Sequence, residues 1–359
     1  MLNHIATINL DISEFSLKAA RLYARGGDIY LGSAKRAHIP DGYIIKGRIR
    51  ALKEVAQAIK GILNSIQDGR RKERLVNLVL PDTATFVKLI EVELPESYGR
   101  NEIEQAINKE LAHHIPYSLD DVYLDWQTIE KYKGYDEILV GACPKEIVEE
   151  YSSVIHLAGF APKSLEIECL PITRAIFPLH RQKRKDLANK NIVVIDLGEA
   201  RSSIIFYREK MYTGADSIEF SVSIPFSGKE IDALMQEELK LTPAQATTLK
   251  FRLGLIVREP YRGMVQTVLE PLLQGLIERI RESIEFHTTH FQGSLINPIL
   301  LCGGGANLRG LDAYIANAMG ISVRRADPLM NIKNKEGLDQ SDAMAYCTTI
   351  GLGLKDFFV

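Results

Sequence analysis

Alternating apolar and polar positions in the first 84 residues predict a small sheet that is covered by a helix. Residues 1 to about 38 have the pattern of a β-meander, and a strand is expected over residues 75–80, ending at Pro81. A helix is expected between residues 49 and 66. Its apolar positions repeat with a period of about 3.6, which gives one buried face: Leu52, Val55, Ile59, Ile62, Leu63 and Ile66.

The pattern changes between residues 85 and 164, where it predicts a compact βαββαβ unit. Strands are expected over residues 86–94, 122–129 and 137–143, and helices over 100–114 and 144–158. Pro144 suits a helix start and Gly159 a helix end. We therefore expect an inserted subdomain of about 80 residues with its own small sheet.

From Asn191 onward the chain alternates strands with helices again. Helices are expected over residues 232–240 and 265–291, and Thr242 with Gln245 forms a capping box. Residues 341–358 predict one closing helix whose small residues allow tight packing against a neighbour. The fold class is therefore α/β.

One motif occurs twice, as an apolar strand that runs into an aspartate and a short polar turn. The aspartates are Asp11 and Asp196, and a third strand opens into the glycine loop 303–305. Tight turns direct backbone N–H groups toward an anion, aspartate faces a hydrated cation, and glycine admits a close ligand. An aspartate after a single apolar strand is more often a turn residue. The ordered trio instead describes an actin-like ATPase cleft between two RNase H-like lobes.

Length and composition narrow the class of protein. A chain of 359 residues should hold more than one domain, because single cores stop growing at about 250 to 300 residues. A net charge of −2 gives no field that favours nucleic acid or an anionic membrane. The four cysteines are far apart, which suggests reduced thiols in the cytoplasm. No apolar run approaches the roughly 20 residues that span a bilayer. The basic run 181–185 is interpreted as a solvated linker, and adjacent His113 and His114 as a poor metal site.

With these elements placed, the sequence resembles the PilM family of type IV pilus assembly proteins over essentially its whole length. The resemblance rests on stretches that include residues 10–18, 80–82, 110–117, 159–168, 224–226, 249–250, 280–286, 299–311, 326–328 and 343–354. It implies an FtsA-like arrangement of subdomains. The first lobe would comprise residues 1–84, and it would be completed by about 165–190 and by the C-terminal helix 341–359. The insertion would comprise residues 85–164. The second lobe would comprise residues 191–340, with a helical subdomain at about 228–297.

The resemblance also implies binding of ATP and Mg²⁺. Asp11 and Asp196 would orient magnesium-bound waters, and Glu168 would orient an attacking water. Turn-capping roles for the two aspartates, a solvated Lys18 and a buried hinge role for Glu168 remain alternatives. The candidate nucleotide-binding residues are Ser13, Glu14, Ser16, Lys18, Gly198, Arg201, Ser202, Gly228, Lys250, Gly303, Gly304, Gly305 and Asn307.

The phosphate turns depart from the family pattern. The first is Ser13-Glu14-Phe15-Ser16, and Glu199 follows Gly198 in the second. Two like charges about 4 Å apart repel by about 4 kcal/mol at an effective dielectric of about 20. Thr247 stands where actin-like proteins place a ribose-binding acid before Lys250. An ATP-binding pseudo-ATPase or a very weak ATPase is therefore expected rather than an efficient enzyme.

In that family the partner is the N-terminal cytoplasmic tail of the inner-membrane protein PilN, together with other pilus assembly proteins. The resemblance places the tail around residues 79–90 and 160–168, and brings the protein to the membrane only through partners. An FtsA-like division or cytoskeletal adaptor is an alternative, but the chain stops too soon after its core helix for an amphipathic anchor. A small-molecule kinase is a second alternative, without a motif for an acceptor pocket.

Overall fold

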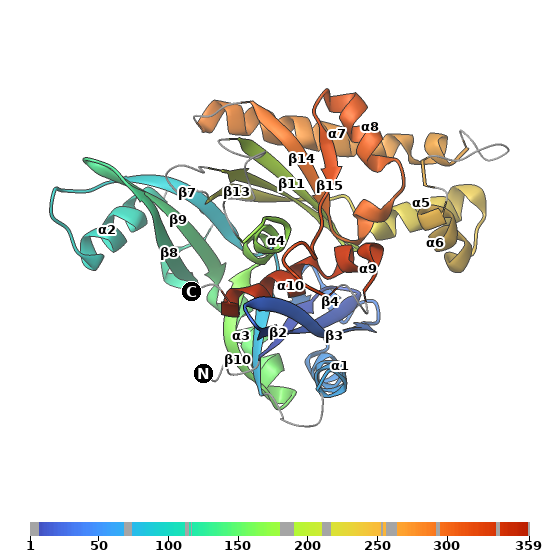
Figure 1. The fold of residues 1–359 in the computed structure, drawn as a ribbon, viewed down its shortest axis with the longest axis horizontal. Helices are drawn as coiled ribbons and strands as arrows, with labels where there is room; N and C mark the ends of the chain where they lie inside the picture. The colour runs from blue at the N-terminus through green and yellow to red at the C-terminus, as the bar shows by residue number, and fades with distance from the viewer. Residues whose placement is uncertain are drawn as a thin grey trace.

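The computed structural model describes residues 7–67, 74–111, 115, 117–179, 190–209, 217–252, 254–255, 264–291, 295–334 and 338–357. The basic run and the histidine pair considered above lie outside these ranges. Figure 1 shows two α/β lobes with α4 (Cys169–Ile176) and α10 (Cys347–Leu354) between them, and an extension formed by β7 (Phe86–Glu93), β8 (Val122–Lys131), β9 (Tyr135–Pro144) and α2 (Arg100–Leu111). None of the described helices is long and apolar enough to cross a membrane.

The first lobe is built on a five-stranded sheet of order β10-β6-β1-β2-β3. Its strands are β1 (Ile8–Ile12), β2 (Ser16–Arg25), β3 (Asp28–His38), β6 (Leu75–Leu80) and β10 (Ala161–Ile167). The meander β1-β2-β3 is antiparallel, as expected, whereas β6 is parallel to both β1 and β10. A two-stranded ladder, β4 (Ile44–Ile45) with β5 (Arg48–Ile49), follows the meander.

Helices cover both faces of this sheet, because successive strand residues point to opposite sides. On β2, Leu17 and Ala19 pack into a core with α1 (Leu52–Ser65) and α3 (Lys145–Leu157). Ala20 belongs to the opposite core, which also contains α4 (Cys169–Ile176) and α10 (Cys347–Leu354). The second core continues into the other lobe and thus lies between the two sheets.

The second lobe and the extension share one eight-stranded sheet of order β15-β14-β11-β12-β13-β7-β9-β8. The second-lobe strands are β11 (Asn191–Leu197), β12 (Ser202–Arg208), β13 (Ser217–Ile224), β14 (Ile296–Cys302) and β15 (Val323–Arg325). The helices of the second lobe are α5 (Gly228–Leu239), α6 (Pro243–Arg252), α7 (Met264–His290) and α8 (Leu311–Met319). A short 3₁₀ turn, η3 (Gly304–Asn307), follows β14, and another, η1 (Leu119–Asp121), precedes β8 in the extension.

The expected inserted unit is divided between the two sheets. β7 (Phe86–Glu93), β8 (Val122–Lys131), β9 (Tyr135–Pro144) and α2 (Arg100–Leu111) form the extension, and β7 joins β13 at the pair Phe220 and Lys88. β10 instead extends the first-lobe sheet beside β6, and α3 packs in the first-lobe core. The apolar stripe on α3 predicts a buried face but does not specify which sheet covers it. The domain boundaries remain a prediction.

The closing helix is interrupted. It was expected to run continuously from residue 341, but α9 (Gln340–Ala345) and α10 are separated at Tyr346, where ψ is 11°, and the 3₁₀ turn η4 (Lys355–Phe357) follows. The expected tight packing is confirmed: a Cβ on Gly351 would lie 1.7 Å from the carbonyl oxygen of Pro171 on α4. The gap in the helix lets α9 contact the glycine turn η3 while α10 stays on the first lobe.

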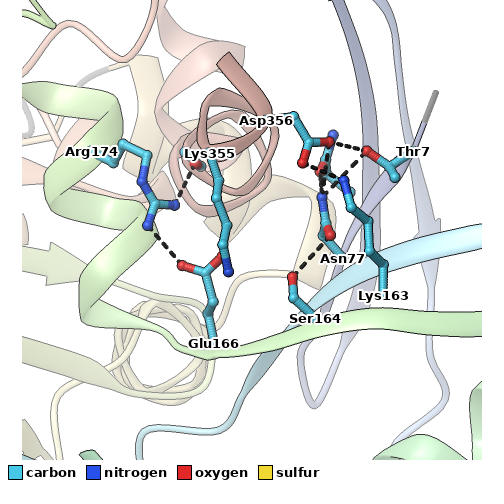
Figure 2. A network of polar contacts seen from close by, with 10 residues as sticks. Thr7, Asn77, Lys163, Ser164, Glu166, Arg174, Lys355 and Asp356 are labelled. Carbon is cyan, nitrogen blue, oxygen red and sulfur yellow. Dashed lines mark hydrogen bonds and ion pairs between the residues drawn. The ribbon is translucent and has the colours of Figure 1, made fainter. Parts of the chain in front are cut away.

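A polar network attaches the C-terminal turn to the first-lobe sheet (Figure 2). The Asp356 carboxylate accepts hydrogen bonds from Thr7 and from Asn77 (3.4 Å), and pairs with Lys163 at 2.5 Å. Glu166 on β10 pairs with Arg174 on α4 at 2.8 Å and with Lys355 at 3.0 Å. These contacts connect η4, the turn that follows α10, to β10, and connect β10 to α4.

Candidate functional site

A cleft of about 310 Å³ lies where the two lobes face each other. The strand ends of both sheets meet there, because β1 and β11 each end at a turn that enters the cleft. Most of the sequence-predicted site residues line it: Asp11, Ser13, Glu14, Lys18, Glu168, Asp196, Gly198, Arg201, Gly228, Lys250, Gly303, Gly304 and Gly305. The two turn motifs and the glycine loop therefore share one cavity.

The first turn is fixed by its own polar side chains. The Ser13 N–H donates to the Ser16 carbonyl (3.0 Å), and the Ser13 hydroxyl donates to Asp11 Oδ1 (2.9 Å). Lys18 faces Asp11 in the β1–β2 register and pairs with it at 2.6 Å. Burial lowers the pKa of Lys18, but Asp11 more than offsets this, so the pKa is raised. Lys18 is therefore a fixed positive charge beside Asp11.

The second turn follows Asp196 and needs glycine at position 198. A Cβ on Gly198 would lie 2.2 Å from the Arg201 carbonyl oxygen, so a side chain cannot fit there. The start of α5 is attached to this turn, since the Gly228 N–H donates to the Gly198 carbonyl and the Lys229 N–H to the Glu199 carbonyl, both at 3.0 Å. The second turn and α5 thus form one continuous wall of the cleft.

The glycine loop after β14 lies directly against the second turn. Gly303 has φ 78°, and a Cβ there would lie 2.4 Å from Asp196 Oδ1 and 2.6 Å from the Leu197 carbonyl oxygen. A Cβ on Gly305 would lie 2.9 Å from Leu197. Only glycine combines this positive φ with so close an approach. The loop contacts the strand end that carries Asp196.

Four carboxylates converge on the cleft: Asp11, Asp82, Glu168 and Asp196. Burial, followed by the charges of Asp82 and Asp11, raises the pKa of Glu168 well above its usual range. Burial raises the pKa of Asp196 to about 6, although Lys18 opposes the shift. The pKa of Asp82 is also raised by burial, against a hydrogen bond from Ser203. Burial is the largest cause of all three pKa shifts, and a cation beside these acids would favour their charged forms.

Asp82, Asp232 and Arg36 are charged residues of the cleft to which the sequence analysis gave no role. Asp82 follows β6 after a single proline, a strand-then-acid signal like those of Asp11 and Asp196. Asp232 on α5 pairs with Lys250 at 2.6 Å, so a carboxylate reaches this lysine from another helix although Thr247 replaces the expected acid. Arg36 on β3 lines the cleft and lies opposite Lys18 in the β2–β3 register.

Three predicted site residues do not line the cleft. Ser16 is buried at the start of β2, and the Ser202 hydroxyl donates to the Phe226 carbonyl at 2.7 Å. The Asn307 amide donates to the Ser341 carbonyl at 2.8 Å and accepts from Arg325. Ser202 and Asn307 are thus engaged in contacts within the fold.

The residues fit a nucleotide that brings its own divalent cation. Carboxylates outnumber cationic side chains around the cleft, seven (Asp11, Glu14, Asp82, Glu168, Asp196, Glu199 and Asp232) to four (Lys18, Arg36, Arg201 and Lys250). The buried Oδ1 atoms of Asp82 and Asp232 have no hydrogen-bond partner. Within the described ranges, no three His, Cys, Asp or Glu side chains form a metal site. Phosphate oxygens and water would therefore have to complete the coordination of an ion.

Solved structures share this fold. A structure titled "PilM-PilN type IV pilus biogenesis complex" matches with a TM-score of 0.80 and 20% identity over 98% of this chain and 99% of that one. The ethanolamine utilization protein EutJ from Carboxydothermus hydrogenoformans gives 0.57 and 14% identity over 97% and 89%. MreB 5 of Spiroplasma citri bound to AMPPNP gives 0.52 and 12% over 96% and 94%. The actin-like ATPase fold expected from the sequence is confirmed.

The family comparison covers nearly the whole chain. The family model described as "Type IV pilus assembly protein PilM" matches residues 9–357, a span that includes both lobes, the extension and the cleft. The resemblance inferred from the sequence motifs is thereby confirmed. This chain belongs to the PilM family of type IV pilus assembly proteins.

Proposed function

We propose that this protein is the cytoplasmic adaptor of a type IV pilus assembly machine, and that it binds the N-terminal tail of the inner-membrane protein PilN. The family match over residues 9–357 carries this proposal. The solved structure whose title names a PilM-PilN complex adds support, because it shares the fold of the whole chain. Association with the inner membrane would then occur through PilN.

The docking place proposed for the tail is the junction of the first lobe with the extension, around residues 79–90 and 160–168. β10 is at the end of the first-lobe sheet, so one of its edges faces away from β6. Residues 161–165 of β10 are partly or fully exposed. An extended peptide can add its backbone to such an edge and place alternate side chains in neighbouring pockets.

Titration calorimetry with a synthetic peptide from the cognate PilN N-terminus tests the adaptor proposal. We expect binding with or without magnesium-ATP, because residues 161–167 of β10 do not line the cleft, although the docking region borders it at Asp82 and Glu168. A scrambled peptide of the same composition is the control for charge-driven binding. The absence of binding to a folded protein would refute the proposal.

Hydrogen exchange of the peptide complex locates the docking place. We expect slower exchange in residues 163–167, because the N–H groups that face away from β6 would gain acceptors from an added strand. The other edge of the same sheet, β3 (Asp28–His38), is the matched control and should be unchanged. Protection of β3 alone would place the tail at the wrong edge and exclude the β10 site.

The cleft is proposed to hold ATP with Mg²⁺ and to turn it over slowly or not at all. Lys18, Arg201 and the backbone of the two turns would hold the phosphates, Asp11 and Asp196 would orient magnesium-bound waters, and the glycine loop would face the nucleoside. The bound Mg²⁺ would supply neutralisation of phosphate charge.

The second turn limits the chemistry proposed for this site, because Glu199 places a carboxylate directly after Gly198. Glu168, at the start of α4, is the residue proposed to orient a water, and burial raises its pKa well above the usual range. Product analysis under single-turnover conditions should show ATP binding with slow or undetectable release of phosphate. Multiple fast turnovers would contradict the pseudo-ATPase interpretation.

A further inference from the structure

Arg36 on β3 stands next to the first phosphate turn but is engaged by the opposite lobe. It faces Lys18 in the β2–β3 register and lines the cleft. Its Nη2 lies 2.6 Å from Oε2 of Glu199, which belongs to the second phosphate turn. The ion pair therefore spans the cleft from one lobe to the other, at the place where a bound polyphosphate would lie.

Two other cations of the cleft are held more firmly than Arg36. Lys18 pairs with Asp11 at 2.6 Å, and their side chains are 13% and 4% exposed. Lys250 pairs with Asp232 at 2.6 Å and also donates to the Gly228 carbonyl. The Arg36 and Glu199 side chains, by contrast, are 48% and 45% exposed. Exposed ion pairs contribute little to stability, so an incoming anion displaces Glu199 at small cost.

We propose that Arg36 is a phosphate-binding residue of the nucleotide site, and that Glu199 occupies it as an internal competitor until nucleotide enters. A guanidinium donates hydrogen bonds to a carboxylate and to a phosphate in the same bidentate geometry, so one anion can replace the other. This inference rests on the proposal that the cleft takes magnesium-ATP. It also accounts for a carboxylate in a phosphate turn, because Arg36 neutralises Glu199 in the free protein.

A double-mutant cycle on the full chain tests the proposal. Magnesium-ATP is titrated by calorimetry into the wild type, E199Q, R36Q and the double variant at fixed ionic strength. We expect E199Q to tighten binding about two- to fivefold, which is the range that exposed ion pairs cover. R36Q should weaken binding about tenfold through loss of a charge-assisted contact. E199Q should then give little further tightening in the R36Q background.

A second ion pair provides the matched control. Lys229 and Asp41 also join the two lobes at 2.6 Å, with side chains 48% and 69% exposed, and neither lines the cleft. D41N therefore removes a cross-lobe contact without releasing a cation in the cleft. We expect its magnesium-ATP affinity to equal that of the wild type. Tightening by D41N as strong as that by E199Q would mean that loosened lobes, rather than a released Arg36, improve binding.

The results that would overturn the role of Arg36 can be distinguished from a failure of the adaptor function. Equal tightening by E199Q in the wild type and in R36Q would show simple repulsion by Glu199 and overturn the proposal. Absence of magnesium-ATP binding to E199Q at millimolar concentrations would overturn it too. Titration of the PilN peptide into the same variants measures the adaptor function separately, and circular dichroism confirms that each variant is folded.

Discussion

Arg208 on β12 binds Glu137 on β9 through both terminal nitrogens, Nη1 at 3.0 Å from Oε1 and Nη2 at 2.6 Å from Oε2. The pair joins a second-lobe strand to a strand of the extension, and the side chains are 14% and 7% exposed. β13 and β7 meet at the single register pair Phe220 and Lys88. The ion pair therefore reinforces a junction that has little ladder of its own.

Glu137→Gln should lower the free energy of unfolding by about 1 to 3 kcal/mol, because Arg208 loses its bidentate partner and keeps the more distant carboxylate of Glu219 at 4.0 Å. Urea denaturation measures the change. The control is Glu282→Gln, which breaks an ion pair with Arg279 on α7. The Arg279 and Glu282 side chains are 55% and 62% exposed, so this change should alter the free energy of unfolding by less than about 0.5 kcal/mol. Equal effects at both sites would contradict a structural role for the junction.

Much of the fold could be predicted because apolar runs are bounded by turn residues. The strand expected over residues 75–80 has the bounds of β6, and the capping box is present, with the Thr242 N–H donating to Gln245 Oε1 at 2.9 Å. The place of α3 and β10 could not be predicted. Their patterns would suit either sheet, and the parallel pairing of β10 with β6 joins segments far apart in the sequence.

The site could be predicted where a strand ends in an acid or a glycine loop. Asp11, Asp196 and Gly303 share one cleft because the ends of their strands meet at the interlobe face. Asp232 and Arg36 could not be found in this way. Each reaches the cleft from within an element, Asp232 from α5 and Arg36 from near the end of β3, and its partner, Lys250 or Glu199, belongs to a separate element or turn. Such pairings are fixed by tertiary packing.

Gly351→Ala should destabilise the protein by several kcal/mol or prevent folding. The added Cβ would lie 1.7 Å from the Pro171 carbonyl oxygen, so α10 would have to move away from α4. Gly275→Ala is the control, since a Cβ on this α7 glycine meets no atom within 4 Å, and alanine in a helix is favoured by about 1 kcal/mol. Thermal unfolding should shift in opposite directions. A neutral Gly351→Ala would show that the helix contact is adaptable.

Magnesium-ATP affinity should fall as the pH is lowered from about 7.5 to about 5.5. Burial raises the pKa of Asp196 to about 6, so protons compete with the cation in this window. The stability of the free protein should change in the opposite direction. Because the pKa of Asp196 is raised in the folded state, the free energy of unfolding increases as the pH falls through about 6 and decreases as the pH rises. The same pH series on Asp196→Asn measures the effect of protonating the nucleotide itself, and this effect is then subtracted. The same slope in both proteins would exclude Asp196 as the titrating group.

Asp11→Asn and Asp196→Asn should each weaken magnesium-ATP binding about tenfold, because both acids are expected to accept hydrogen bonds from magnesium-bound waters. The isosteric change keeps the turn geometry, including the acceptor for Ser13 at Asp11 Oδ1. Far-UV circular dichroism and binding of the PilN peptide should remain as in the wild type. The exposed Asp120, outside the cleft, provides the control variant Asp120→Asn, which should bind nucleotide normally.

The two aspartate variants also distinguish three roles for the cleft. Unfolding of either variant would make that aspartate a structural turn cap, since a lost ligand contact alone does not change the circular dichroism spectrum. Weaker magnesium-ATP binding with intact peptide binding would show a working nucleotide site that is separate from the partner groove. Unchanged nucleotide affinity in both variants would mean that these acids do not hold the cation. The actin-like lobes would then serve as a scaffold. The aspartates are carried by β1 and β11, and each strand belongs to the sheet of one lobe whatever the cleft binds.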